Sequence, residues 1–171
     1  RGLMYSTDNL KEIELVNASF GQGISLTPLQ VAMSFAAVAN DGLLMKPYLV
    51  RKIVTKDKEI EFKPRPISRP ITSNTSERMV TLLTSAVSGG EAKFFVSKKY
   101  NIAGKTGTAQ VPTAGGYDAN RTNATFVGFL PSYKNFVLFV KLEEPTSPSG
   151  YAAETAVPLW MAIVEKLAAY Y

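Results

Sequence analysis

Apolar residues recur at helical spacing in three segments of the chain. The first follows Thr27, which can cap a helix; Pro28 suits the first helical position, and Gln30 stands where a capping-box partner belongs. Apolar residues then continue to Asn40 with almost no polar face, and Gly42 provides a stop. The pattern predicts a helix over residues 28–40 that is buried on most sides.

Two further helices are predicted later in the chain. Asn74 and Glu77 have the spacing of a cap and its partner before an apolar stripe that ends at the glycines 89 and 90. The last helix is expected over residues 152–169, with its apolar residues on one stripe and Trp160 anchoring it to a sheet.

Runs rich in β-branched and aromatic residues predict strands between these helices. Residues 48–55 and 59–62 favour a short exposed hairpin, and the prolines that follow favour an extended connector over residues 63–71. Residues 125–130 and 136–142 are apolar on both alternating faces, as in a hairpin whose sheet is covered on both sides. Residues 112–123 are expected to form a loop, and glycines 21 and 23 a tight turn. We therefore predict an α/β (α+β) fold with a mostly antiparallel sheet covered by helices.

Composition narrows the possible chemistry. The 171 residues are 46% hydrophobic and 19% charged, which fits a single globular domain and not a disordered chain. Cys and His are absent, so disulfides, zinc fingers and catalysis by Ser-His-Asp or Cys-His sets are excluded for these residues. Acid–base work must fall to Lys, Asp, Glu, Tyr or hydroxyl groups, and we expect no metal and no cofactor.

Charge and hydropathy restrict the function less than the absence of Cys and His does. The net charge of +5 would suit an anionic partner but selects none, and the Lys-rich stretch over residues 46–63 is expected to be a solvated face. No apolar run approaches the roughly 20 residues that cross a bilayer. Residues 117–121 carry Tyr, Asp, Asn and Arg, for which we favour a solvated loop over a substrate groove.

The most informative string is Ala-Gly-Lys-Thr-Gly-Thr-Ala at residues 103–109. It matches the end of a nucleotide P-loop, but that motif requires glycine at the position of Lys99. The alternative is a Lys-Thr-Gly motif on a strand edge, of the kind found in serine enzymes that lack a catalytic histidine. A chance string in a strand turn is the third possibility, and the string by itself does not exclude it.

Each residue of this string has a role on a strand edge. Lys105 supplies positive potential and a proton donor. Thr106 and Thr108 lie two positions apart, hence on one face, where both can bind a carboxylate while Gly107 admits a substrate backbone. The Thr108 amide can point at an oxyanion. Gln110 falls on the same face if the pleat continues.

Four other strings accompany this one in order and at similar spacing. They are Gly-Gln-Gly at residues 21–23, Thr-Pro-Leu-Gln-Val-Ala at 27–32, Ala-Ala-Val-Ala-Asn-Asp-Gly at 36–42 and Phe-Val-Gly-Phe at 126–129. Together, from about residue 20 to residue 169, they resemble the C-terminal part of the transpeptidase domain of class B penicillin-binding proteins. The resemblance implies the penicillin-binding transpeptidase and serine β-lactamase-like fold, with residues 1–171 forming the C-terminal portion of one domain.

The resemblance also implies a function. A peptidoglycan D,D-transpeptidase cross-links stem peptides through a serine acyl-enzyme and is acylated by β-lactams. Lys105 and Thr108 match its catalytic residues, and Thr106, Gly107, Thr108 and Gln110 its substrate-binding residues. A non-catalytic β-lactam sensor or scaffold domain of the same fold is the alternative. Nucleic acid is not expected as a partner, although a basic nucleic-acid module remains a distant third possibility.

The nucleophile of that family is missing from this sequence. No Ser has Lys three residues later, as a Ser-x-x-Lys motif requires, and none has Asn two residues later, as Ser-x-Asn requires. We therefore expect both motifs upstream of Arg1, in the other half of the domain, and we expect the 171 residues alone to be inactive. The whole protein is expected to act on the extracytoplasmic face of the membrane, anchored by an N-terminal helix outside this chain, among membrane proteins of cell-wall synthesis.

Overall fold

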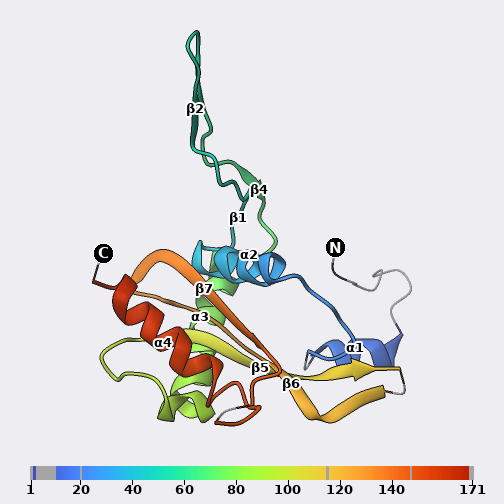
Figure 1. The fold of residues 1–171 in the computed structure, drawn as a ribbon. Coiled ribbons are helices and arrows are strands. Elements are labelled where there is room, and N and C mark those ends of the chain that lie inside the picture. Colours follow the sequence, from blue (N-terminus) through green and yellow to red (C-terminus); the bar gives the residue numbers. More distant parts are fainter. Residues whose placement is uncertain (1, 3–10, 20, 115, 147, 170–171) are drawn as a thin grey trace.

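The computed structural model describes residues 2, 11–19, 21–114, 116–146 and 148–169. Three long antiparallel strands form its central sheet in the order β5 (Ala103–Thr113), β6 (Gly116–Leu130) and β7 (Tyr133–Glu143) (Figure 1). The helices that surround this sheet are α2 (Pro28–Ala39), α3 (Ser73–Gly89) and α4 (Ala156–Leu167). The predicted α+β class, with an antiparallel sheet and helices against it, is confirmed.

The sheet is longer than the sequence pattern predicted. The expected hairpin over residues 125–142 is present, with its turn at Pro131 and Ser132, but the expected loop over residues 112–123 is wrong. There β5 and β6 continue as a two-stranded ribbon in which Thr113 pairs with Gly116. A register shift after Gln110 takes up the extra residues of β6, and Gly116 turns the chain at a φ of 136°. The glycines and polar residues that suggested a loop serve a bulge and a turn.

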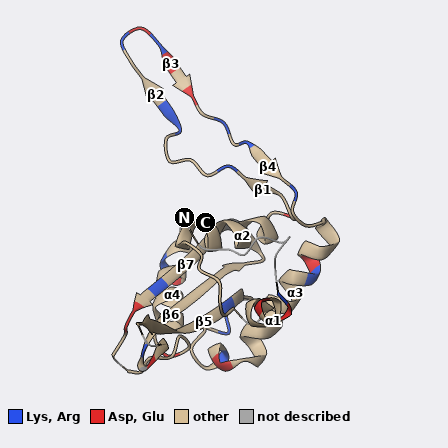
Figure 2. Cartoon of the chain, turned by 90° about the vertical axis from the view of Figure 1, so that its right-hand side faces the viewer, with Lys and Arg blue, Asp and Glu red and all other residues tan. Residues whose placement is uncertain are grey.

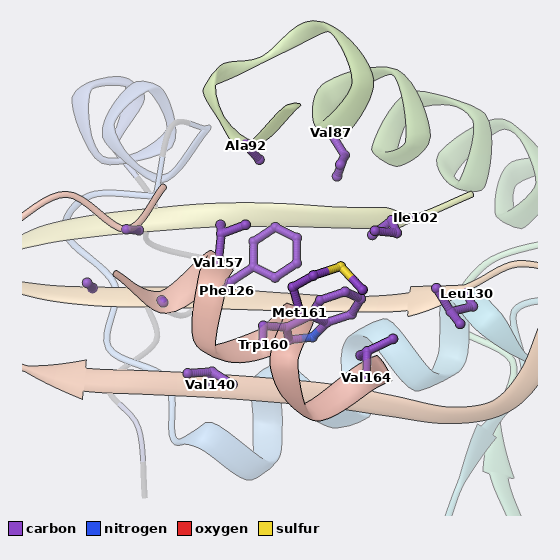
Figure 3. Close-up of a cluster of buried hydrophobic side chains, with 13 residues drawn as sticks. Val87, Ala92, Ile102, Phe126, Leu130, Val140, Val157, Trp160, Met161 and Val164 are labelled. Carbon is purple, nitrogen blue, oxygen red and sulfur yellow. The ribbon is translucent and has the colours of Figure 1, made fainter. Parts of the chain in front are cut away.

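Helix α4 packs against one face of the sheet through the predicted stripe. Trp160 is fully buried and meets the Phe126 ring edge to face, with centroids 5.0 Å apart (Figure 3). Its Nε1 donates a hydrogen bond to the Leu138 carbonyl at 2.9 Å. The predicted anchoring role of Trp160 is confirmed. The helix begins at Ala156, four residues later than predicted, so Pro158 lies in its first turn, where no backbone donor is required.

Helix α2 packs on the opposite side, against β7 and α3. Its predicted capping box is confirmed: the Gln30 amide donates to Thr27 Oγ1 at 3.2 Å, and the Thr27 amide donates to Gln30 Oε1 at 2.9 Å. The predicted burial on most sides is wrong, because only Ala37 and Ala39 are buried and Leu29 is 58% exposed. The other residues of this helix are half-buried or exposed.

Loss of the capping box has a measurable consequence. We expect Thr27→Ala to lower the free energy of unfolding by about 1 kcal/mol, because the Gln30 amide loses its acceptor. Chemical denaturation should show a lower midpoint with an unchanged slope. Ser34→Ala, at an exposed site on the same helix, is the control and should change stability by less than about 0.5 kcal/mol. Equal stability of Thr27→Ala and the parent protein would contradict the assignment.

Helix α3 lies along the outer edge of β5 and contributes to both cores. Leu83 packs with Ala103 and Phe129 on the side of α2, whereas Val87 belongs to the cluster around Trp160. The helix begins at Ser73, and its cap is Thr72, two residues before the predicted cap Asn74. The Thr72 hydroxyl accepts a hydrogen bond from the Thr75 amide. A short 3-10 helix, η2 (Glu91–Phe94), follows α3. Together they cover the beginning of β5.

A thin extension projects from the body between α2 and α3 (Figures 1 and 2). It contains the predicted hairpin, as β2 (Lys52–Val54) and β3 (Glu59–Glu61), and the predicted extended connector, in which β4 (Pro66–Ser68) pairs with β1 (Leu44–Met45). The predicted hairpin is confirmed.

The N-terminal part of the described chain holds one helix that the sequence pattern did not predict, α1 (Glu12–Ser19). The predicted turn after it is confirmed by positive φ angles at Gly21 and Gly23, although residue 20 lies outside the described residues. In the described ranges, every helix is too short or too polar to cross a membrane.

Candidate active site

Residues 105–108 occupy the point where β5 leaves the core. Residues 102–104 are buried, Thr106 and Gly107 are half-buried, and Lys105 and Thr108 are exposed. β5 pairs with β6 on one side only, so its other edge has no strand partner in the described part of the chain. A P-loop requires a loop that leads into a helix. The string lies instead inside strand β5. An edge of this kind can pair with an extended peptide.

Lys105 places its ammonium group against its neighbour on the strand. Its Nζ donates to the Thr106 carbonyl at 3.1 Å and lies 3.4 Å from Thr106 Oγ1. No carboxylate neutralises Lys105 within the described ranges. The strand edge therefore carries an exposed cation beside a hydroxyl group, which favours an anionic ligand.

On one side, Gly107 packs against Thr125 of β6. A Cβ at this position would lie 2.5 Å from Thr125 Oγ1, and that hydroxyl donates a hydrogen bond to the Gly107 carbonyl at 3.1 Å. The missing side chain therefore makes room for Thr125, and its predicted role in admitting a substrate backbone stays a prediction. Thr125 was missed because only the register of β5 with β6 brings it opposite Gly107.

Thr106, Thr108 and Gln110 share one face of β5, as the alternation predicted, and their ladder with β6 is regular up to the shift after Gln110. Thr108 Oγ1 accepts a hydrogen bond from the Ala152 amide at 3.1 Å. Its hydroxyl proton stays available for a second hydrogen bond, because a hydroxyl group both accepts and donates. Gln110 is exposed on this face.

Two cavities flank the edge of β5, and Lys105 and Thr106 line both of them. The larger, about 320 Å³, extends from Gly107 to the start of α2 at Pro28 and Val31. The smaller, about 210 Å³, lies between the edge and the end of α3. The edge of β5 that carries the motif is therefore open on both sides.

The larger cavity contains a second cation, Lys141 on β7. Lys141 differs from Lys105 because its Nζ forms an ion pair with Glu143 at 2.6 Å. That hydrogen bond and the charge of Lys141 lower the pKa of Glu143. Lys105 is thus the cation of this cavity that remains available to a ligand. No group of three or more acidic side chains in the described ranges could hold a metal ion.

The residues expected in a solvated loop lie on β6 instead. Arg121 binds Asp118 at 2.8 Å and Glu144 at 3.2 Å, which ties the far end of the ribbon to the end of β7. Hydrogen bonds from the Arg121 side chain and the Asn120 amide hold the pKa of Asp118 below its ordinary value. Since this pKa is lowered in the folded chain, the contact stabilises the fold above the ordinary pKa and is lost as pH falls through the lowered value.

Removal of the guanidinium tests this arrangement. In Arg121→Gln, we expect the pKa of Asp118 to rise toward its ordinary value of 3.8, incompletely because the Asn120 amide still donates to the carboxylate. NMR titration of the side-chain carboxyl carbons measures the pKa of Asp118. Lys141→Gln is the matched control: it should raise the pKa of Glu143 and leave Asp118 unaffected. An unchanged Asp118 titration in Arg121→Gln would refute the contact.

Comparison with known proteins finds relatives over nearly the whole chain. A family model described as the penicillin binding protein transpeptidase domain matches residues 4–165. The chain is 29% identical over 162 residues to stage V sporulation protein D of Bacillus subtilis, and 32% identical over 159 residues to the peptidoglycan D,D-transpeptidase FtsI of Buchnera aphidicola. These alignments cover 92% and 91% of the chain.

A solved structure agrees with these relatives. Penicillin-binding protein 3 of Mycobacterium tuberculosis, in complex with aztreonam, superposes with a TM-score of 0.85 at 29% identity and covers 97% of the chain. The chain spans 40% of that solved protein, and 25% and 27% of the two curated relatives.

Proposed function

This chain belongs to the penicillin-binding protein transpeptidase family, and on that premise we propose that it forms one wall of the active site of a peptidoglycan D,D-transpeptidase. The resemblance seen in the sequence, to the class B members, is confirmed. The observation that carries the proposal is the position of the Lys-Thr-Gly-Thr string, on the exposed edge of β5 between two cavities.

The wall binds the anionic end of a stem peptide. Lys105 attracts the terminal carboxylate, and the hydroxyl groups of Thr106 and Thr108 donate hydrogen bonds to it. The peptide lies extended along the edge of β5 beyond the part that α3 and η2 cover. The Thr108 amide then faces the carbonyl oxygen that becomes negatively charged during acyl transfer, a contribution of about 3–4 kcal/mol in enzymes where such a donor has been removed. β-Lactams, which carry a carboxylate and a reactive carbonyl, bind in the same place.

The reaction proceeds by two acyl transfers. A serine hydroxyl attacks the carbonyl of the penultimate D-alanine, the peptide bond breaks, and the terminal D-alanine leaves as an amine that takes up a proton. The amine of a second stem peptide then attacks the ester, restores the serine and forms the cross-link. Lys105 helps to move the proton between hydroxyl and amine, because no histidine is present in this chain.

The serine is supplied from outside these 171 residues, in a segment with the Ser-x-x-Lys and Ser-x-Asn motifs. We propose that this segment packs on the sheet face of Lys105, where Val127 and Phe139 line the larger cavity. The complete protein acts on the outer side of the cytoplasmic membrane, to which a segment outside this chain anchors it.

The absence of the motif predicts that residues 1–171 alone form no covalent adduct. Incubation with a fluorescent penicillin should leave them unlabelled, because removal of the nucleophile from a serine enzyme lowers the reaction rate by several orders of magnitude. The full-length protein should be labelled under the same conditions, and boiling the penicillin-treated sample in denaturant should not release the label. Rapid labelling of the 171 residues would overturn the proposed origin of the serine.

Cross-linking activity distinguishes a transpeptidase from a β-lactam sensor. The full-length protein, given peptidoglycan strands with intact stem peptides, should form cross-linked dimers that mass spectrometry detects after digestion. Labelling by penicillin without any cross-linked product would exclude the transpeptidase and favour the sensor.

A further inference from the structure

All of the excess positive charge lies on the projecting extension. Residues 46–69, here called the arm, contain eight Lys and Arg and three Asp and Glu, a net charge of +5 that equals that of the whole chain. The other 147 residues contain eleven of each sign. The arm stands clear of the body in two views at right angles (Figures 1 and 2), and β2 and β3 form a sheet of their own. The net positive charge of the chain is therefore concentrated on the arm.

Charges of both signs lie on one face of the arm. Lys52 pairs with Glu61 and Val54 with Glu59 across the ladder. Lys52 also forms an ion pair with Glu59 at 2.6 Å. Both acidic residues of the hairpin strands thus lie on this face, which we call the mixed face.

The opposite face is apolar and basic. Ile53 lies directly across from Ile60, and Phe62, the residue after β3, lies two positions from Ile60 and so on the same face. The three side chains form a row and remain 39–42% exposed. Arg51 and Lys58 stand at the two ends of this row, and the ladder continues to them through hydrogen bonds from the Phe62 amide to the Arg51 carbonyl and from the Thr55 amide to the Lys58 carbonyl. We call these five residues the arm face; neither cation forms an ion pair within the described ranges.

An isolated two-stranded hairpin has no core of its own, so the exposed apolar side chains of the arm face are available to a partner. Three of the exposed apolar residues of the hairpin lie on the arm face and Val54 lies on the opposite face, whereas the tip is polar at Lys56 and Asp57. That distribution fits a protein surface laid against the face better than insertion into a lipid bilayer. We infer that the arm face docks a partner protein whose surface presents acidic side chains around an apolar patch.

A selection experiment tests this chemistry. A library of random twelve-residue peptides displayed on phage is panned on the full-length protein, with counter-selection on the double variant Ile60→Ser/Phe62→Ser. We expect enrichment of peptides that combine Asp or Glu with aromatic or aliphatic residues. By fluorescence anisotropy, an enriched peptide should bind the double variant at least about tenfold more weakly.

The arm supplies its own control. Val54 is 67% exposed on the mixed face, away from the arm face, so Val54→Ser should change the affinity less than about twofold. All variants should retain labelling by fluorescent penicillin and an unchanged melting temperature, which separates failure of this inference from failure of the proposed catalytic function.

Four outcomes would overturn the inference. They are no enrichment, equal binding by the double variant, tighter binding of the arm face to vesicles of phosphatidylglycerol than to any peptide, and a concentration-dependent dimer in sedimentation velocity that Phe62→Ser abolishes. The last two would assign the face to a lipid surface or to a second copy of this chain.

Discussion

Replacing Lys105 by alanine is expected to slow acylation of the full-length protein by a β-lactam about 10²–10⁴-fold, the range typical of a positioned proton-transfer group. The variant loses the exposed cation that lines both cavities and that touches Thr106. Stopped-flow or gel-based labelling with fluorescent penicillin gives the second-order rate constant.

Lys141→Ala is the matched control, because Lys141 lines the same cavity but is neutralised by Glu143. We expect its acylation rate to stay within about threefold of the parent, since an exposed ion pair contributes little. A Lys105→Ala variant that reacts at the parental rate, or a Lys141→Ala variant that is equally slow, would remove Lys105 from the proposed site.

Replacing Trp160 by alanine is expected to lower the free energy of unfolding by about 3–5 kcal/mol, the usual cost of deleting a buried aromatic side chain. Trp160 is 0% exposed and contacts Phe126, and its Nε1 satisfies the Leu138 carbonyl. Chemical denaturation of the full-length protein, followed by a signal from this domain, measures the loss.

Two variants separate the causes of that loss. Trp160→Phe keeps most of the buried ring but leaves the Leu138 carbonyl without its donor, so about 1–3 kcal/mol should be lost. Leu159→Ala, at a neighbouring position that is 42% exposed, should cost less than about 1 kcal/mol. Equal stability of Trp160→Ala and Leu159→Ala would contradict the described packing of α4.

The sequence was sufficient to predict the elements whose determinants are close together in the chain. The Thr27 cap, the stripe around Trp160 and the hairpin at the tip of the arm were predicted because their determinants lie within a few residues of one another. The placement of Thr106, Thr108 and Gln110 on one face followed from the period of a strand.

Features set by distant contacts were not predictable in this way. Thr125 is paired with Gly107 by the register of two strands, and Thr108 meets the Ala152 amide across 44 positions. Helix α2 has the composition of a core helix, yet only Ala37 and Ala39 are buried in it. The apolar composition of a helix shows that its residues favour burial. Whether they are buried depends on which other segments pack against the helix.

The position of a bound β-lactam tests the central claim most directly. In a crystal structure of the full-length protein acylated by ampicillin, we predict that the drug carboxylate lies within hydrogen-bond distance of the Thr106 or Thr108 hydroxyl. The ester carbonyl oxygen should lie about 2.7–3.1 Å from the Thr108 amide. An adduct bound elsewhere, with the edge of β5 at Lys105 left empty, would contradict the proposed wall of the active site.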